Sequence, residues 1–320
     1  MRELLAHPDI VPNKGNMGLA SPFNIACQEG HLEIVDLMLA DPRVEVNQQQ
    51  RDLASPLYKA CQEGHTEIVR RLLKDPRVDT SLATRTGHCP LFIACQNGRT
   101  GIVKLLMADP RVDINQSMEV NATPFFSACE NGREDILRVL LADPRADVTL
   151  LTHSGASPFF VVCQNGHNHV IDLLLEDQRV DINLSRHDNS SPLWFASQNG
   201  HLDVVRHLLA SDRFVITHTM SDFNGKTAAE QARVMQVRPR SGDDEAEEEF
   251  LRRRANCNQI ADLIEAYSID PLTIRSELRQ RPGIRGLTFL SFFLFRCGRD
   301  PEPPPPPPPF KRSTLVASSP

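Results

Sequence analysis

The chain has 320 residues, 40% of them hydrophobic and 24% charged, with 35 Lys and Arg against 41 Asp and Glu. No apolar stretch of about 18 residues is present, so we expect no integral membrane association. The net charge of −6 repels phosphate backbones, and we therefore expect no binding to nucleic acid. The 24 prolines are too many for a compact helical protein, and the eight cysteines suggest disulfides or a metal site unless their positions explain them.

Residues 1–20 match the second half of a unit that recurs later in the chain. Ala6-His7-Pro8 and Asn13 lie 34 residues before Ala40-Asp41-Pro42 and Asn47. We expect the C-terminal half of a truncated repeat here, which indicates an incomplete gene model or a fragment. Repeat-coding sequence upstream of Met1 would test this expectation.

From residue 21 onward the sequence repeats every 34 residues. Three series of residues keep this spacing: Pro22, Pro56, Pro90, Pro124, Pro158 and Pro192; Pro42, Pro76, Pro110 and Pro144; Gly30, Gly64, Gly98, Gly132, Gly166 and Gly200. The sequence therefore predicts six repeats, at 21–54, 55–88, 89–122, 123–156, 157–190 and 191–224.

The unit 55–88 shows what each repeat is expected to fold into. Ser55 is a good N-cap and Pro56 suits the first position of a helix, while Gly64 can end that helix in the left-handed conformation. A second helix follows with apolar residues on one face, and Asp75-Pro76 ends it. The remainder, up to His88, reads as an extended loop with a turn.

Two helices of this size cannot bury their apolar faces alone, so the units must stack on one another. The residues resemble the ankyrin family, through Ser55-Pro56-Leu57, Ala60-Cys61, Gly64-His65, Ile68-Val69 and Leu72-Leu73 in that order. The resemblance covers residues 21 to about 232 and implies an all-α fold, an α-solenoid of helix-loop-helix ankyrin repeats with short extended loop hairpins.

Two features depart from the usual ankyrin unit. The repeat is one residue longer, because an Asp-Pro-Arg-Val-Asp loop follows the second helix. The histidine of the first turn is replaced by a mostly aromatic set, Asn24, Tyr58, Phe92, Phe126, Phe160 and Trp194. We expect these side chains to fill the core, with a stacking platform for ligands as the alternative.

Five of the eight cysteines follow the same period and explain most of the cysteine count. They are Cys27, Cys61, Cys95, Cys129 and Cys163, and Ser197 takes the position in the sixth repeat. A site that accepts Cys or Ser is a small buried packing site, so we expect neither disulfides nor bound metal nor any other cofactor. Reduced thiols indicate the cytoplasm, or else the nucleus.

The Asp-Pro-Arg loops place one arginine beside one aspartate in four repeats, at Asp41-Pro42-Arg43 and at 75–77, 109–111 and 143–145. Because each of these arginines has its own aspartate two residues earlier, we do not expect a repeating anion-binding surface. We expect these pairs to contribute to solubility and register, at about 0–1 kcal/mol for each exposed pair.

Residues 225–267 resemble a degenerate capping repeat with an insertion at 233–256. The insertion runs from acidic to basic and reads as a solvated loop or exposed helical spur, with docking or nuclear import through Arg252-Arg253-Arg254 as the alternative. Residues 268–286 are expected to form a polar helix or linker.

Residues 287–320 combine an apolar run with a proline-rich tail that we expect to be disordered. The run Leu287 to Phe295 is too short to span a membrane and reads as packing on the last repeat, or else as a transient membrane or partner contact. Pro306, Pro309 and Lys311 fit the pattern that SH3-like domains bind, and a profilin-like reader of polyproline is a further candidate.

The ankyrin resemblance implies a non-catalytic scaffold that binds a partner protein through a concave groove and loop tips. A regulatory or inhibitory fragment of a larger multidomain protein is the alternative. An enzyme is the least expected class, because His and Cys recur by repeat position instead of gathering once. No catalytic, cofactor-binding or metal-binding residue is predicted.

The loop tips differ between repeats, whereas the helix ends hardly differ, so the tips are the candidate partner-binding residues. They are Arg51, Asp52, Arg85, Thr86, His88, Glu119, Val120, His153, Ser154, His187 and Asp188. The excess of Arg and His among them favours an acidic segment of the partner.

Overall fold

The computed structural model describes residue 7 and residues 10–215, 225–237 and 247–284. Within these ranges the chain forms fifteen helices and no strand, as the predicted all-α solenoid requires. Each of the six units predicted from the 34-residue period, here repeats 1 to 6, contains a pair of helices. The first helices are α2 (Pro22–Glu29), α4 (Pro56–Glu63), α6 (Pro90–Gln96), α8 (Pro124–Glu130), α10 (Pro158–Asn165) and α12 (Pro192–Gln198). The second helices are α3 (Leu32–Leu39), α5 (Thr66–Lys74), α7 (Thr100–Ala108), α9 (Glu134–Leu141), α11 (Asn168–Glu176) and α13 (Leu202–Ala210).

The first helices begin and end at the residues that the sequence indicates. In repeat 2 the Ser55 hydroxyl accepts a hydrogen bond from the backbone N–H of Tyr58 at 3.1 Å, and Pro56 occupies the first turn. Gly64 ends α4 in the left-handed conformation, with φ of 93°. A larger residue would be strained at this φ, and its Cβ would displace the Arg99 guanidinium of the next repeat, which would lie only 2.8 Å away.

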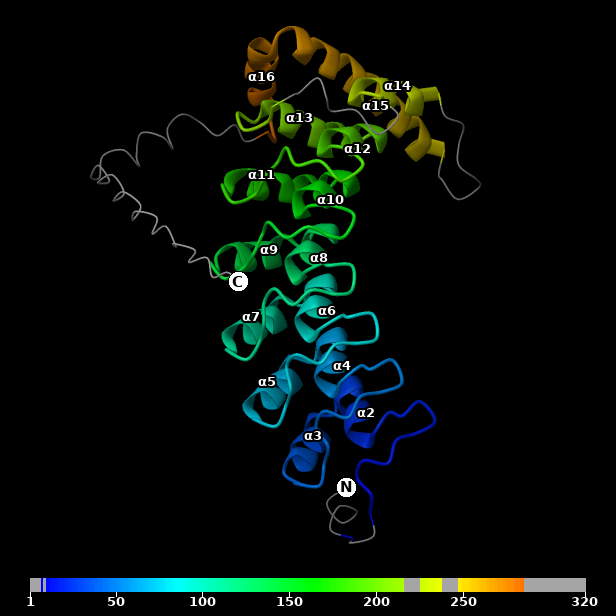
Figure 1. Cartoon of the computed structure of the whole chain (residues 1–320), viewed down its shortest axis with the longest axis vertical. Helices are drawn as coiled ribbons and strands as arrows, with labels where there is room; N and C mark the ends of the chain where they lie inside the picture. The colour runs from blue at the N-terminus through cyan, green and yellow to red at the C-terminus, as the bar shows by residue number, and fades with distance from the viewer. Residues whose placement is uncertain (1–6, 8–9, 216–224, 238–246, 285–320) are drawn as a thin grey trace, which may run out of the picture. The chain divides into compact units, whose positions relative to one another are not determined.

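The helices form two layers, and a hairpin loop joins each repeat to the next on the side of the first helices (Figure 1). Each hairpin is closed by its own backbone, as where the Thr84 N–H donates to the His88 carbonyl at 3.0 Å. Neighbouring hairpins are also linked, since the Arg85 N–H donates to the Asp52 carbonyl at 2.9 Å. The tips are therefore held in a row beside the first helices.

The core lies between the layers and between repeats. The aromatic series and Asn24 are buried, with at most 8% of any of these residues exposed, so these side chains fill the core as expected. The five periodic cysteines are free and buried, and burial raises the pKa of each thiol. They act as small packing residues.

The last turn of almost every helix receives side-chain donors from the following repeat. After the first helices the donor is the residue that follows the glycine: His65 reaches the Gln28 carbonyl at 2.8 Å, and Arg133 reaches that of Gln96 at 3.0 Å. The equivalent contacts at His167 and His201 are 2.8 and 3.0 Å long. These carbonyls have no partner within their own helix, so the next repeat satisfies them.

The arginines of the Asp-Pro-Arg loops do the same for the second helices. Arg77, Arg111 and Arg145, with Arg179 of the equivalent Asp-Gln-Arg loop, each donate to a carbonyl 38 residues earlier, at 2.7 to 2.9 Å, and to the aspartate two residues before them. A guanidinium at a helix C-terminus also complements the helix dipole. The series is thus more than a source of solubility, because it joins each repeat to the one before.

The C-terminal helices continue this arrangement beyond repeat 6. These are α14 (Ala228–Val237), α15 (Glu247–Ile269) and α16 (Pro271–Arg279). Asn256 of α15 donates to the Gly200 carbonyl at 3.1 Å, and Arg279 of α16 donates to the Ala210 carbonyl at 2.9 Å. The end of the array is therefore capped by side chains that replace those of a further repeat.

Helices extend into both ends of the segment predicted as an insertion, 233–256. α14 continues to Val237, and α15 already begins at Glu247, because the acidic and basic residues of this run stand at helical spacing and are good helix formers. The predicted polar helix at 268–286 is split, since α15 ends at Ile269 and Asp270 caps α16. The described residues contain no helix long and apolar enough to cross a membrane. The tail, with Pro306, Pro309 and Lys311, lies outside the described residues.

The third residue before the proline of each first helix adopts the left-handed conformation, and this turn carries strain in two repeats. Leu19 and Leu53 adopt φ of 63° where later repeats have Gly87, Asn121, Gly155 or Asn189. A leucine there costs about 1–2 kcal/mol relative to a residue that tolerates positive φ.

We expect Leu53→Asn to stabilise the protein by about 1 kcal/mol, because Leu53 is 41% exposed and loses little burial. The reciprocal change Asn121→Leu should destabilise it by at least as much, since Asn121 also donates to the Leu151 carbonyl at 2.7 Å. Urea unfolding of both variants measures the effect. A lower midpoint for Leu53→Asn would contradict the assignment of strain.

The aspartates of the Asp-Pro-Arg loops predict a loss of stability in acid. The hydrogen bond from Arg111 lowers the pKa of Asp109, and Arg77 does the same for Asp75. A carboxyl whose pKa is lower in the folded state stabilises fully above its unfolded pKa of about 3.9, and the contribution is lost as the pH falls through the folded pKa.

Asp109→Asn should therefore lower the unfolding midpoint at neutral pH and make the further loss between about pH 5 and pH 2 less steep. Glu119→Gln, on an exposed hairpin tip, is the matched control and should follow the original protein. Parallel acid curves for Asp109→Asn and the original protein would show that these pairs do not set the acid response.

Candidate functional site

The residues predicted for partner binding lie on the row of hairpin tips. Nine of them are exposed, namely Arg51, Asp52, Arg85, Thr86, Glu119, Val120, His153, Ser154 and His187. His88 and Asp188 are half-buried. The structure thus brings residues from five repeats to one surface, which we call the tip row.

Several of these side chains also form hydrogen bonds or ring contacts that stabilise the hairpins. Asp52 accepts from the Ala54 N–H at 3.0 Å, and Asp188 accepts from the Ser190 N–H at the same distance. Arg85 donates to the Arg51 carbonyl at 3.0 Å. His88 stacks flat on Phe92, with ring centroids 4.7 Å apart, and burial lowers the pKa of its imidazole.

One groove of about 430 Å³ opens beside the tip row, between hairpins of repeats 3 to 5 and the first helices of repeats 4 and 5. Three predicted residues line it: Val120, His153 and Ser154. The other lining residues were not predicted as partner-binding residues: Phe126, Glu130, Thr152, Ala156, Phe160, Val161, Gln164, Asn165 and Arg186. We call this the tip groove. Five of its twelve lining residues are apolar and seven are polar or charged, so the groove offers a ligand both apolar contacts and hydrogen-bonding groups.

Arg186 is the main residue that the sequence analysis did not single out. Its guanidinium carbon lies 5.5 Å from the ring centroid of Phe160 and 5.8 Å from that of Phe195. The equivalent positions in the other repeats are uncharged, Asn16, Gln50, Thr84, Met118 and Thr152. A charged residue at an otherwise uncharged repeat position was the signal that could have identified it.

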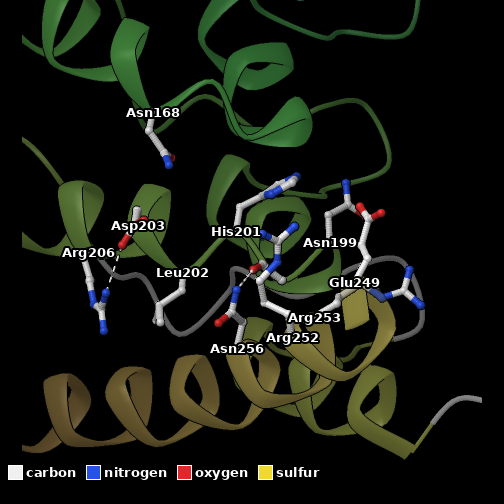
Figure 2. A pocket seen from close by; sticks show the side chains of 11 residues that line it. Asn168, Asn199, His201, Leu202, Asp203, Arg206, Glu249, Arg252, Arg253 and Asn256 are labelled. Atoms are coloured by element: carbon white, nitrogen blue, oxygen red, sulfur yellow. Dashed lines mark hydrogen bonds and ion pairs between the residues drawn. The ribbon is translucent and has the colours of Figure 1, made fainter. Parts of the chain in front are cut away.

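A second hollow, of about 650 Å³, lies where α15 meets the turn between α12 and α13 (Figure 2). Its lining includes Arg206, Glu249, Arg252 and Arg253 with Asn256. Arg206 forms an ion pair with Asp203 at 2.9 Å, and the Asn256 side chain donates a hydrogen bond to the Gly200 carbonyl. Acidic and basic groups alternate here, so the hollow has no single charge for a ligand to match.

The histidines after the periodic glycines hold helix ends together. Because their acceptors are carbonyl oxygens, Nε2 of His65, His167 and His201 must carry the proton. Burial lowers the pKa of His201, which favours the neutral ring. In the part of the chain that the structure describes, no group of three or more His, Cys, Asp and Glu side chains is placed to hold a metal ion.

Comparison with known proteins agrees with the fold. The family model described as "Ankyrin repeats (3 copies)" matches residues 23–118, 76–152 and 125–220. A solved structure, "Crystal structure of the ankyrin repeat domain of Bcl-3: a unique member of the IkappaB protein family", is 21% identical, with a TM-score of 0.57. That match covers 66% of this chain and 93% of the other. A search of the curated proteins finds no significant match. The repeats, the stacked helix pairs and the family match together show that the chain belongs to the ankyrin repeat family.

Proposed function

We propose that the chain is a non-catalytic scaffold that binds a partner protein through the tip row and the tip groove. Ankyrin repeats generally mediate interactions between proteins, which supports the class of function. The location rests on the tip groove, because it opens beside the hairpin tips, where the repeats differ in sequence.

Charge supports an acidic segment as the ligand. Arg51 and Arg85 bring positive charge to the hairpins, and Arg186 adds a guanidinium whose carboxylate neighbour, on Asp188, is 3.7 Å away. The arginines of the Asp-Pro-Arg loops and their equivalent Arg179 are held more closely by their own aspartates, at 2.6 to 2.7 Å. Complementary charge at such a rim acts mainly on the rate of association and its salt dependence.

The proposal also covers the cell compartment and the proline tail. Buried free thiols suit a reducing compartment, the cytoplasm or the nucleus. The proline tail with Pro306, Pro309 and Lys311 suits an SH3-like or profilin-like reader. A regulatory or inhibitory fragment of a larger protein would use the same surface, and the neighbour's membership of the IkappaB family is compatible with that alternative.

Arg51→Glu together with Arg85→Glu should weaken binding of the acidic partner about tenfold and reduce its salt dependence, because the rim charge is reversed. The full chain is used to capture partners, and the affinity of each purified partner is then measured at several salt concentrations. Circular dichroism and urea unfolding check that the variant remains folded, since Arg85 also donates to the Arg51 carbonyl.

The matched control reverses two exposed arginines of the second-helix layer, Arg70→Glu with Arg138→Glu. It should leave the affinity within about twofold of the original, because this layer lies away from the hairpins. Equal losses for the two double variants, or no loss for the tip variant, would contradict binding of an acidic segment at the tip row.

A further inference from the structure

Arg186 differs from the arginines that hold the array together. Arg111 donates to Asp109 and to three carbonyls of the preceding repeat, and its counterparts are similarly engaged. The Arg186 guanidinium makes no hydrogen bond to any residue within the described ranges, and its Nε is buried without a partner. The nearest carboxylate oxygen, on Asp188, is 3.7 Å from Nη1, too far for a hydrogen bond.

The side chain is nonetheless fixed in place. Only 25% of it is exposed, and its guanidinium carbon lies over the rings of both Phe160 and Phe195, which meet edge to face at 4.9 Å. Stacking on aromatic rings leaves the edge of a guanidinium available, and this edge matches a carboxylate through two parallel N–H donors. A preorganised arginine also loses less freedom when it binds.

We propose that Arg186 is the carboxylate-binding subsite of the tip groove and that it takes an aspartate or glutamate side chain from an extended segment of the partner protein. This inference rests on the proposed function and adds the ligand chemistry. It also assigns the charge preference of the groove to one residue that lies outside the tip row.

The remaining walls of the groove define the neighbours of that acidic side chain. Val120 is 48% exposed and supplies the main apolar contact of the groove, beside the largely buried Phe126 and Val161. Glu130 is exposed and lines the groove too, so it disfavours a second acidic residue on its side. The geometry therefore points to a single acidic residue next to apolar ones, and a polyanion would be repelled by Glu130 and Asp188.

A packing role for Arg186 makes a different prediction. If the side chain only covers Phe160 and Phe195, methionine should replace it without loss of binding, since it covers the rings with a similar apolar length. If the guanidinium binds a carboxylate, the Arg186→Met variant should remain folded and should bind the ligand more weakly. Arg186→Lys should retain part of the affinity, because it keeps the charge and loses the two-pronged geometry.

The test uses a display library of random twelve-residue peptides selected on the full chain. Enriched peptides are synthesised with amidated C-termini, which separates side-chain carboxylates from a chain end. Their dissociation constants are measured for the original protein, Arg186→Met, Arg186→Lys and the groove variant Val120→Ser. Arg138→Gln is the matched control, because Arg138 is exposed on α9 and pairs with Glu134.

We expect the selected peptides to share one acidic residue beside an apolar residue. Arg186→Met should weaken their binding about tenfold or more, and Glu→Gln or Asp→Asn in the peptide should give a similar loss. The two changes together should cost little more than either alone, which shows that the two groups interact directly. Arg138→Gln should have no effect.

Three outcomes would overturn the inference. Peptides that lose affinity with Val120→Ser but not with Arg186→Met would leave the groove as a binding site without the carboxylate subsite. Peptides that bind only with a free C-terminal carboxylate would show that the groove binds a chain end and not an acidic side chain. An absence of any enriched peptide, or binding unaffected by both groove variants, would count against the proposed function as well.

Discussion

The array depends on hydrogen bonds that side chains of one repeat donate to the helix ends of the repeat before it. A helix leaves its last carbonyl groups without partners, and helices of seven to nine residues, as in repeats 1 to 6, have a large share of such groups. His65 and Arg77 serve these groups on the two helices of repeat 1. Stacking is therefore required both to bury the apolar faces and to satisfy the backbone.

This constraint separates the residues that maintain the fold from those that are free to bind. The periodic histidines and arginines are engaged by their neighbours, and Asn47 spans to the next repeat in the same way, donating to the Arg77 carbonyl at 2.7 Å. Some residues that differ between repeats have side chains that make no such hydrogen bond to a neighbouring repeat. Arg186 and Val120 are of this kind, and both line the tip groove.

The sequence predicted the fold well because each repeat carries local signals in the same order. Ser55, Pro56 and Gly64 fix a helix through its own caps, and the period then locates the equivalent helices in the other repeats. The partners of Arg77 and His65 could not be predicted, because they lie 37 or 38 residues away in sequence and depend on how the repeats are stacked. The extent of α15 was missed because its first half reads as a charged run without an apolar face.

The binding surface was predicted less completely than the fold. Variation between repeats identified His153 and Ser154, which line the groove, but it also identified Asp52, which helps to form its own hairpin. Arg186 stands at the base of a hairpin. Its guanidinium is held by Phe160 and Phe195 without a hydrogen-bond partner, which only the three-dimensional packing shows.

The most direct measurement is a crystal structure of the full chain with a peptide selected from the library. A peptide carboxylate paired with the Arg186 guanidinium in the tip groove is the expected result, and a peptide seated on the second-helix layer would contradict the division between periodic and binding residues.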